Sequence, residues 1–356
     1  MKKILSAVAI LLAAFLVASC AKQPEAPAKN RYSATFIELF DTASTIIGYD
    51  ADKESFTAFA EGVKAELLEY HKLYDIYNSY EGIVNIKTLN ETAALAPVKV
   101  DGRIVDLLKY SKYIYEVTQG KTNIAFGAVL QIWHNYREDG INSPENSELP
   151  PMETLREAAA HTDINDIIID EENCTVFFAD PLLRLDVGAI AKGYATEMAA
   201  KRIIAQGRTD VLLSIGGNVR ALGAKPDGSA WVVGIENPDK YAEEASGESL
   251  FRLEITSGSV VTSGDYERYY TVDGVRYHHI IDPETLMPAA YYRAVSVLTE
   301  DSGLADGLST GLFCLPYEQA RALADSLPGV DVCQITPDGE IRQTDGYAAH
   351  VQKNPE

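Results

Sequence analysis

The stretch Leu185-Asp186-Val187-Gly188-Ala189-Ile190-Ala191-Lys192-Gly193-Tyr194-Ala195 joins an apolar, strand-like run to a helical one. Small residues at such a junction let the backbone approach a ligand closely, and the free N–H groups of a helix start can bind an anion. Asp186 adds a hydrogen-bond acceptor and Lys192 adds a cation. The stretch is not a Walker loop, because Tyr194 follows Gly193, and it lacks the GxGxxG spacing. By itself it predicts either a structural turn or a phosphate site.

Two further segments place small residues beside polar ones. Ser214-Ile215-Gly216-Gly217-Asn218 runs from a strand into two glycines, which favours a turn with positive φ. Ala305-Asp306-Gly307-Leu308-Ser309-Thr310 lies in a helical stretch, where the Asp306 carboxylate and the Thr310 hydroxyl share one face. Two hard oxygens suit Mg²⁺. The alternative for this pair is a solvated helix surface.

A fourth segment, Tyr277-His278-His279-Ile280-Ile281-Asp282-Pro283-Glu284-Thr285, carries two histidines before an Asp-Pro turn. Adjacent residues of a strand face opposite sides, so we expect at most one of the histidines in any given cleft. Metal binding by both is therefore disfavoured.

The remaining pattern predicts both helices and strands. Helical spacing of apolar residues indicates helices over residues 53–73, 101–117, 190–205, 302–315 and 317–327. Strands are predicted over residues 35–49 with a break at 41–42, over 167–169, 175–178, 183–187, 211–215, 231–235, 251–255, 269–272 and 275–281, and around Val332 and Ile341. Hairpins without regular strand–helix alternation favour an α+β fold, with mixed or antiparallel sheets and packed helices, over a doubly wound parallel sheet.

Composition limits the partners of the chain. Among 356 residues there are 31 Lys and Arg and 52 Asp and Glu, a net charge of −21. This field repels nucleic acid, although a small anion can bind where amides, a lysine or a metal neutralise it. The four cysteines are too few for a disulfide scaffold and form no CxxC pattern. Cys174, Cys314 and Cys333 are expected to be small buried residues.

The amino-terminal residues have the form of an export signal. Lys2 and Lys3 precede an apolar run, and the ending Val17-Ala18-Ser19-Cys20 resembles a bacterial lipoprotein signal. We therefore expect a signal peptide over residues 1–19, lipidation of Cys20, a tether over 20–31 and a folded domain over 32–356. This would place the domain at the extracytoplasmic face of the bacterial cell membrane. The alternatives are an ordinary secretory signal with a chance cysteine, or a membrane anchor.

Six motifs together resemble one family, the ApbE-type flavin transferases, which are FAD:protein FMN transferases. In chain order they are Phe40-Asp41-Thr42, LDVGAIAKGYA (185–195), LLSIGGNV (212–219), TSGDYERYY (262–270), HHIIDPET (278–285) and ADGLSTGLF (305–313). The resemblance runs from about Phe36 to about Gln334. It implies Mg²⁺-dependent transfer of the FMN half of FAD to a Thr or Ser of another exported protein, with release of AMP.

The resemblance also implies which residues bind. The metal would be held by the Ala189 carbonyl, Asp306 and Thr310. Contacts to FAD would fall on Phe40, Tyr77, Thr122, Asn123, Ile124, Asp186, Lys192 and Ile281, with Gly216-Gly217 and Thr262 to Gly264 lining the same cleft. The match is weaker at Tyr77, because the region from Tyr74 to Asn90 can be shifted by several residues.

The chain departs from the family pattern at two places. Leu286 stands where the family's DPxTGxP has glycine, which changes a turn at the cleft rim. Asn123 stands where many relatives have aspartate, so this position can hydrogen-bond a flavin or adenine edge but brings no charge.

The chemistry that the resemblance implies needs a base for the acceptor hydroxyl. His279 has a suitable intrinsic pKa; the alternative is a strand histidine bonded to backbone. Two other functions use the same segments: Mg²⁺-dependent hydrolysis of FAD to FMN and AMP, and a non-catalytic flavin-binding lipoprotein. The chain contains no Ser/Thr-Gly-Ala-Thr acceptor sequence, so we expect it to modify another protein, with membrane redox-pump subunits and extracytoplasmic reductases as the family's usual targets.

Overall fold

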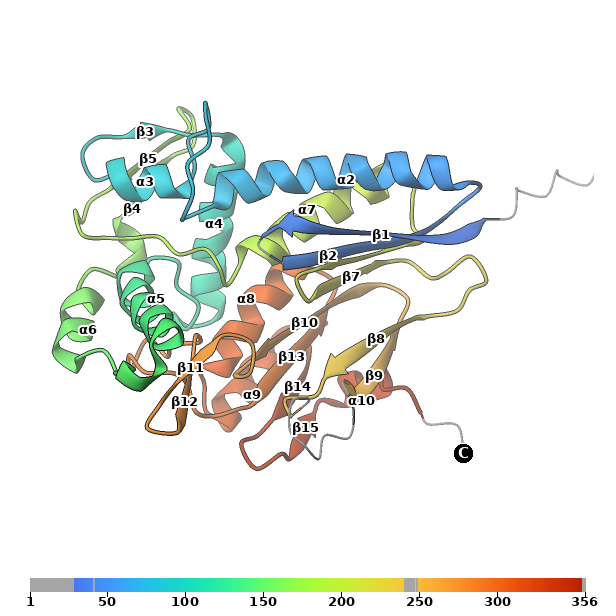
Figure 1. Ribbon diagram of the computed structural model, residues 1–356. Helices are drawn as coiled ribbons and strands as arrows, with labels where there is room; N and C mark the ends of the chain where they lie inside the picture. Colours follow the sequence, from blue (N-terminus) through green and yellow to red (C-terminus); the bar gives the residue numbers. More distant parts are fainter. Residues whose placement is uncertain (1–28, 41, 240–246, 248, 354–356) are drawn as a thin grey trace, which may run out of the picture.

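A large antiparallel sheet is the centre of the molecule, in a computed structural model that describes residues 29–40, 42–239, 247 and 249–353 (Figure 1). Within these residues the sheet has eight strands in the order β1-β2-β6-β7-β10-β13-β14-β15. Their bounds are β1 (Asn30–Leu39), β2 (Thr42–Asp50), β6 (Val211–Ile215), β7 (Asn218–Leu222), β10 (Gly258–Gly264), β13 (Ala294–Thr299), β14 (Asp331–Ile335) and β15 (Ile341–Gln343). Every adjacent pair in this order is antiparallel, so no helical crossover is needed between neighbours.

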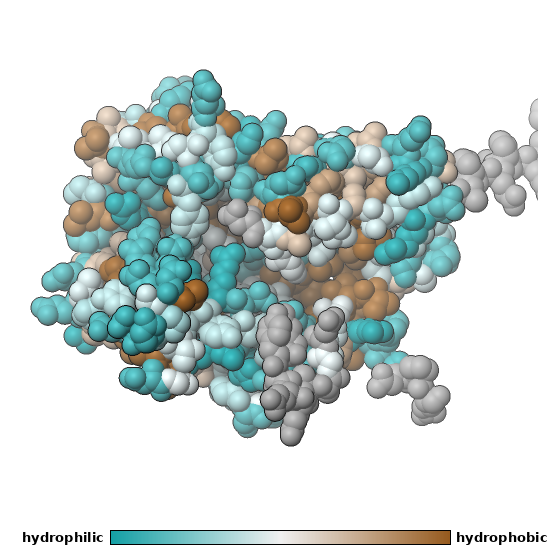
Figure 2. Space-filling model, in the orientation of Figure 1, coloured by the Kyte–Doolittle hydropathy of each residue, from teal (hydrophilic) through white to brown (hydrophobic). Residues whose placement is uncertain are grey.

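The two faces of this sheet pack against different partners. Side chains alternate along a strand, and Leu213 and Val261 point to the side that carries α2 (Lys53–Tyr74), α7 (Ala191–Ala205), α8 (Ser302–Phe313) and α9 (Tyr317–Ser326). Their neighbours Leu212 and Val260 pack on the other side against the ribbon β8 (Trp231–Glu236) and β9 (Ser249–Ile255), near α10 (Asp345–Ala349). Figure 2 shows apolar residues gathered on this side, below β1 and β2.

Smaller elements cover one end of the large sheet (Figure 1). One group comprises α3 (Ile86–Thr92), α4 (Gly102–Val117) and the small sheet of β3 (Val98–Lys99), β5 (Thr175–Phe178) and β4 (Ile167–Asp170). A second group has its own apolar core and comprises α5 (Gly127–Asn142), η1 (Pro144–Asn146), α6 (Met152–Ala159), and the hairpin β11 (Tyr269–Val272) and β12 (Val275–His278). The short η2 (Ile164–Asp166) leads from the second group into β4.

The α+β prediction is confirmed, and most predicted elements lie where the sequence placed them. The predicted strand over 183–187 is wrong. That stretch is extended, but the Asn90 side chain bonds the N–H and carbonyl of Leu185, and the Arg184 carbonyl accepts from Gly127, so no ladder forms. The predicted strand over 275–281 ends at His278, because the Ile280 N–H turns back to His278 Nδ1.

The chain ends and the cysteines complete the comparison with the sequence. Among the described residues, β1 begins at Asn30, and Lys29 Nζ lies 2.6 Å from Asp210. The predicted signal peptide and Cys20 lie outside the described residues. Cys314 and Cys333 are buried and Cys174 is partly buried, and all three are free thiols. In the described part of the chain, no helix combines the length and apolarity needed to cross a membrane.

Candidate functional site: a cleft between the helices and the α5 region

The predicted site residues meet in one cleft of about 740 Å³, a volume typical of small-molecule sites. The cleft lies where the β1–β2 and β6–β7 turns, the ends of α2 and β10, the start of α7, the middle of α8 and the α5 region converge. All twelve residues predicted within the described range line it: Phe40, Tyr77, Thr122, Asn123, Ile124, Asp186, Ala189, Lys192, His279, Ile281, Asp306 and Thr310.

The floor of the cleft is the crossing of α7 and α8. Gly193 lies in the first turn of α7, and its N–H donates to Asp306 Oδ2 at 2.7 Å. A Cβ on Gly193 would lie 2.4 Å from both Asp306 Cβ and the Ser302 carbonyl, so only glycine allows this approach. First-turn amides have no partner within their own helix. Gly193, the second glycine of the LDVGAIAKGYA motif, therefore fixes the position of the Asp306 carboxylate.

The donor set at this floor fits a hard divalent cation. Asp306 is 5% exposed, and burial raises its pKa, while Lys192, the Gly193 N–H and Asn218 act in the opposite direction. Among the described residues, no hydrogen bond uses the Thr310 hydroxyl or ends on the Ala189 carbonyl. A buried carboxylate beside an uncommitted hydroxyl and carbonyl is a set of oxygens that suits Mg²⁺. No group of three His, Cys, Asp or Glu side chains suitable for a metal occurs in the described ranges, so protein carboxylates alone do not form a site.

Asp186 is held at the cleft by backbone contacts. Its N–H donates to the Ile124 carbonyl at 2.8 Å, and its Oδ1 accepts from Gly188 at 2.9 Å. Burial raises the pKa of Asp186, and the nearby side chains of His134, Arg268 and Arg137 lower it. The loop before α7 thus presents a carboxylate to a group of basic side chains.

The polar side chains of the loop before α5 form hydrogen bonds within the protein. The Thr122 hydroxyl donates to the Gly307 carbonyl of α8 at 2.7 Å. The Asn123 amide donates to Thr162 and accepts from Ala125, at 2.9 and 2.8 Å. The side-chain amide of Asn123 thus has one bond at each end, which leaves one N–H and one oxygen lone pair, so its contact with a flavin or adenine edge stays a prediction.

Phe40 and Tyr77 form the rim near the end of α2. Phe40 has φ 53°, and its N–H donates to His71 Nδ1 at 3.1 Å. Tyr77 is 51% exposed, and its ring centroid lies 5.4 Å from that of His134. Aromatic rings exposed at a cleft mouth can stack on a planar ligand. The uncertain match at Tyr77 thus falls on a residue that does line the cleft.

The two histidines have separate environments. His278 is buried, donates from Nε2 to the Ala289 carbonyl at 2.9 Å, and accepts at Nδ1 from Ile280. His279 lines the cleft, and its buried Nδ1 has no partner within the described chain. Burial first, and then the charges of Arg268 and other cations, lower the pKa of His279 to about 3. The ring is therefore neutral near pH 7, with a nitrogen available to accept a proton.

The departure at Leu286 leaves the turn beside His279 intact. Leu286 has φ 60°, the left-handed region that glycine adopts without strain. Its side chain is buried, and its carbonyl accepts from Trp133 Nε1 at 2.9 Å. The turn is further fixed by Lys121, which lies 2.9 Å from both Asp282 and Glu284. Packing and hydrogen bonds thus hold leucine in a glycine-like conformation.

Sequence reasoning missed two cations of the cleft, Arg137 and Arg268. Arg268 lies inside the TSGDYERYY motif, and its place in a family motif could have indicated that it lies in the cleft. Arg137 lies on α5, a helix that the apolar spacing did not reveal, and donates to His134 at 2.8 Å. Together with Lys192 they give a cationic lining to a chain of net charge −21.

The cleft thus combines the oxygens of Asp306, Thr310 and the Ala189 carbonyl with the cations Lys192, Arg137 and Arg268. This combination suits an anionic ligand bound together with a metal ion. The ApbE family model matches residues 40–334, and the chain belongs to this family. The FAD:protein FMN transferase of Treponema pallidum is 34% identical over 281 residues, 75% of each chain. That of Klebsiella pneumoniae is 30% identical over 278 residues, 76% of this chain and 83% of its own. The ApbE protein of Thermotoga maritima superposes with a TM-score of 0.78 at 27% identity, covering 91% of this chain and all of that structure.

Proposed function

We propose that this protein transfers the FMN half of FAD to a Thr or Ser hydroxyl of another protein, with release of AMP. The observation that carries the proposal is the convergence of the eleven family-matched residues and of His279 on one cleft. Family membership and relatives named FAD:protein FMN transferase support it. The acceptor oxygen would form a bond to the FMN phosphorus while the bond to the bridging oxygen breaks, and AMP leaves with that oxygen.

The residues of the cleft divide this work between them. Lys192, Arg137 and Arg268 attract and hold the pyrophosphate, because the rest of the chain would repel it. Asp186 and the rim residues Phe40 and Tyr77 orient the nucleotide ends of FAD. The buried Ile124 and Ile281 provide apolar walls that exclude water from the reacting groups.

His279 is the group that we propose takes the proton from the acceptor hydroxyl. It is neutral, it lines the cleft, and its Nδ1 has no partner among the described residues. The anionic pyrophosphate of a bound FAD offsets the cations that depress its pKa. This offsets only the part of the shift that comes from charge, since burial is the first cause of the lowered pKa, and the neutral ring is the form that can accept a proton.

Asp306, Thr310 and the Ala189 carbonyl would hold Mg²⁺. This ion would supply charge neutralisation on the pyrophosphate oxygens. Asp306 is already oriented by the Gly193 N–H, so its position is set before any ligand enters.

Incubation of the full-length chain in detergent with FAD, Mg²⁺ and a Ser/Thr-Gly-Ala-Thr peptide tests the proposal. Mass spectrometry of the peptide should find a covalent FMN adduct together with one AMP per transfer. Release of free FMN without an adduct would instead establish an FAD pyrophosphatase. Unchanged FAD, bound by the protein, would establish a flavin carrier.

We further propose that a lipid on Cys20 anchors the protein to the extracytoplasmic face of a bacterial membrane. Its acceptors would then be exported or membrane redox proteins. Replacement Cys20→Ser should leave an unprocessed precursor or release the chain from membranes. Unchanged processing and membrane fractionation of the variant would contradict the proposal.

A further inference from the structure

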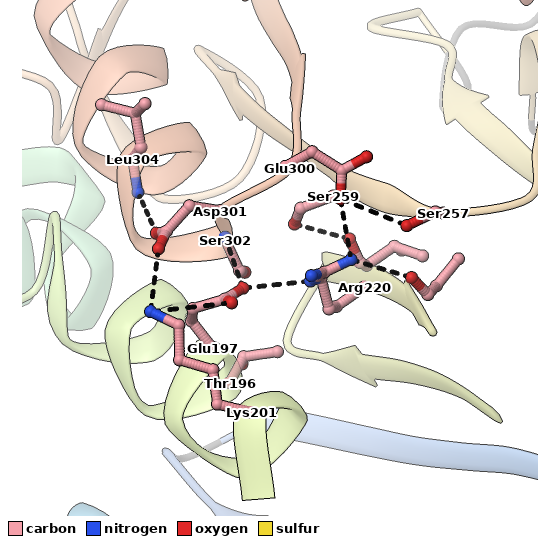
Figure 3. Close-up of polar contacts among 12 residues, drawn as sticks. Thr196, Glu197, Lys201, Arg220, Ser257, Ser259, Glu300, Asp301, Ser302 and Leu304 are labelled. Carbon is pink, nitrogen blue, oxygen red and sulfur yellow. Dashed lines mark hydrogen bonds and ion pairs between the residues drawn. The ribbon is translucent and has the colours of Figure 1, made fainter. Parts of the chain in front are cut away.

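A buried ion pair lies one helical turn beyond the floor of the cleft (Figure 3). Glu197 on α7 and Arg220 on β7 are 3% and 5% exposed, and Arg220 Nε donates to Glu197 Oε2 at 3.0 Å. The same carboxylate oxygen accepts from the N–H of Ser302, the first residue of α8, at 3.0 Å. One carboxylate on α7 therefore binds both β7 and the start of α8.

The contacts of this ion pair involve the same three elements as the contact at the cleft floor, one helical turn further along α7 and α8 and two residues further along β7. Glu197 follows Gly193 by four residues on α7, and Ser302 precedes Asp306 by four on α8, so each pair shares a helix face. Arg220 follows Asn218 by two on β7 and shares its sheet face. We call the bond of Gly193 to Asp306, at the cleft, the outer contact. The bonds of Glu197 to Ser302 and Arg220 are the inner contacts, and they lie directly behind it.

The outer contact has little else to fix it. The crossing helices approach closely at Gly193, where a small displacement along either axis would break the 2.7 Å bond to Asp306. The inner pair is the stronger constraint, because charged groups buried together resist separation. Figure 3 also shows Lys201 at the edge of this network, with its Nζ 3.8 Å from Glu197 and 3.3 Å from Asp301.

We propose that the Glu197–Arg220 pair is a positioning device that sets the register of α7, α8 and β7 and so places the Asp306 carboxylate. Neither side chain of the pair lines the cleft. Its effect on metal binding rests on the proposed function, whereas its effect on the Gly193–Asp306 bond does not. Groups that orient metal ligands typically change metal affinity by about 10- to 100-fold when they are replaced.

The direct test is amide hydrogen exchange at Gly193 in the full-length protein without ligands. As a first-turn amide, Gly193 has only Asp306 to protect it. Glu197→Gln keeps an oxygen for Ser302 but removes the buried counter-charge of Arg220, which then has only the exposed Glu300 carboxylate, 3.8 Å away. We expect exchange at Gly193 to accelerate by about tenfold or more. Titration with Mn²⁺, followed by its electron paramagnetic resonance signal, should show about 10- to 100-fold weaker binding.

A double variant keeps the test valid if the single variant does not fold. Glu197→Gln combined with Arg220→Gln removes the unpaired buried charge and should recover thermal stability, yet exchange at Gly193 should remain fast and Mn²⁺ binding weak. A matched control is Asp50→Asn, which breaks the Asp50–Arg208 pair at the far end of α7, 3.1 Å long and largely buried. This control should lower the melting temperature without accelerating exchange at Gly193.

The outcomes separate the two proposals. A folded Glu197 variant with exchange at Gly193 within about twofold of wild type overturns the positioning role. Equal acceleration in Asp50→Asn also overturns it, since the effect would then reflect general loss of stability. A wild-type chain that binds no Mn²⁺, with or without FAD, would refute the metal site, while the exchange data would still decide the positioning role.

Discussion

The floor and the wall of the cleft are built in different ways. At the floor, Asp306 and Glu197 are almost fully buried and are tied by hydrogen bonds to neighbouring helices. At the wall, Tyr77 is half exposed, and Arg137 comes from a region with its own small core. The floor is therefore held by direct bonds between its helices, whereas the wall is more exposed and comes in part from a separate core. A metal site needs exact geometry, and the proposed ligand Asp306 lies in the more tightly bonded of the two parts.

The sharpest test of the floor is Asp306→Asn. The amide keeps an oxygen for the Gly193 N–H, so the fold should survive, but it removes the charge that would hold the proposed metal. We expect kcat/KM to fall by about 10³-fold or more, since several kcal/mol of charge stabilisation are lost at about 1.4 kcal/mol per tenfold. Steady-state transfer assays across Mg²⁺ concentrations measure this.

Asp325→Asn on α9 is the control for that variant. Asp325 forms an exposed pair with Arg321, so its loss should change stability by less than about 0.5 kcal/mol and leave transfer unchanged. Ordinary activity of Asp306→Asn at ordinary Mg²⁺ would show that the floor is only structural.

His279→Asn tests the base where floor and wall meet. FAD binding should persist, while the chemical step should slow by about 10²- to 10⁴-fold. In the free enzyme a base with a pKa of about 3 is deprotonated throughout the neutral range. The acidic limb of the wild-type kcat/KM profile should therefore lie well below pH 6.5, and an inflection near 6.5 would contradict the assignment.

His278→Asn separates kinetics from stability. It loses the bond to Ala289 and the contact with Phe313, so its melting temperature should fall while turnover per folded molecule changes little. Equal slowing in the two variants would mean that neither histidine is the base.

Gly193→Ala tests the close approach of the two helices. The added methyl would overlap Asp306 and Ser302, so the helices must separate, with a loss of about 1–3 kcal/mol and weaker Mn²⁺ binding. Gly62→Ala on α2, where a Cβ meets nothing within 4 Å, should instead stabilise the protein by about 0.5–1 kcal/mol. Chemical denaturation compares them, and similar effects of the two changes would refute the packing argument.

Leu286→Gly, near the wall, should have the smallest effect on activity. Removing a buried leucine costs about 2–5 kcal/mol, and relief of the left-handed conformation returns about 1–2, so a net loss of about 0–4 kcal/mol is expected. Asp273→Gly, at an exposed turn with φ 49°, relieves similar strain without removing core and should be stabilising. A stabilised Leu286→Gly would show that the turn is strained and not held by packing.

The short motifs predicted the residues of the floor correctly because the constraints on these residues are local in the chain. A glycine pair demands positive φ, and Gly216 and Gly217 have φ 55° and 89°. Four-residue spacing puts Asp306 and Thr310 on one helix face. At the wall, Tyr77 was predicted, but Arg137 was missed because it lies on a helix without a clear apolar period. The strand predicted over 183–187 failed because its backbone is bonded by the distant Asn90.

The sequence by itself determined the α+β class, most of the helices and strands, the family and the residues of the floor, because spacing along a helix or turn fixes which side chains share a face. Only the tertiary structure decided that Asn123 bonds to Thr162, that His278 bonds to the Ala289 carbonyl while His279 lines the cleft, and that Glu197 meets Arg220 behind the site. These facts depend on contacts between residues far apart in the chain. The burial and the charges around each of these residues come from distant parts of the chain, so no local sequence pattern predicts them.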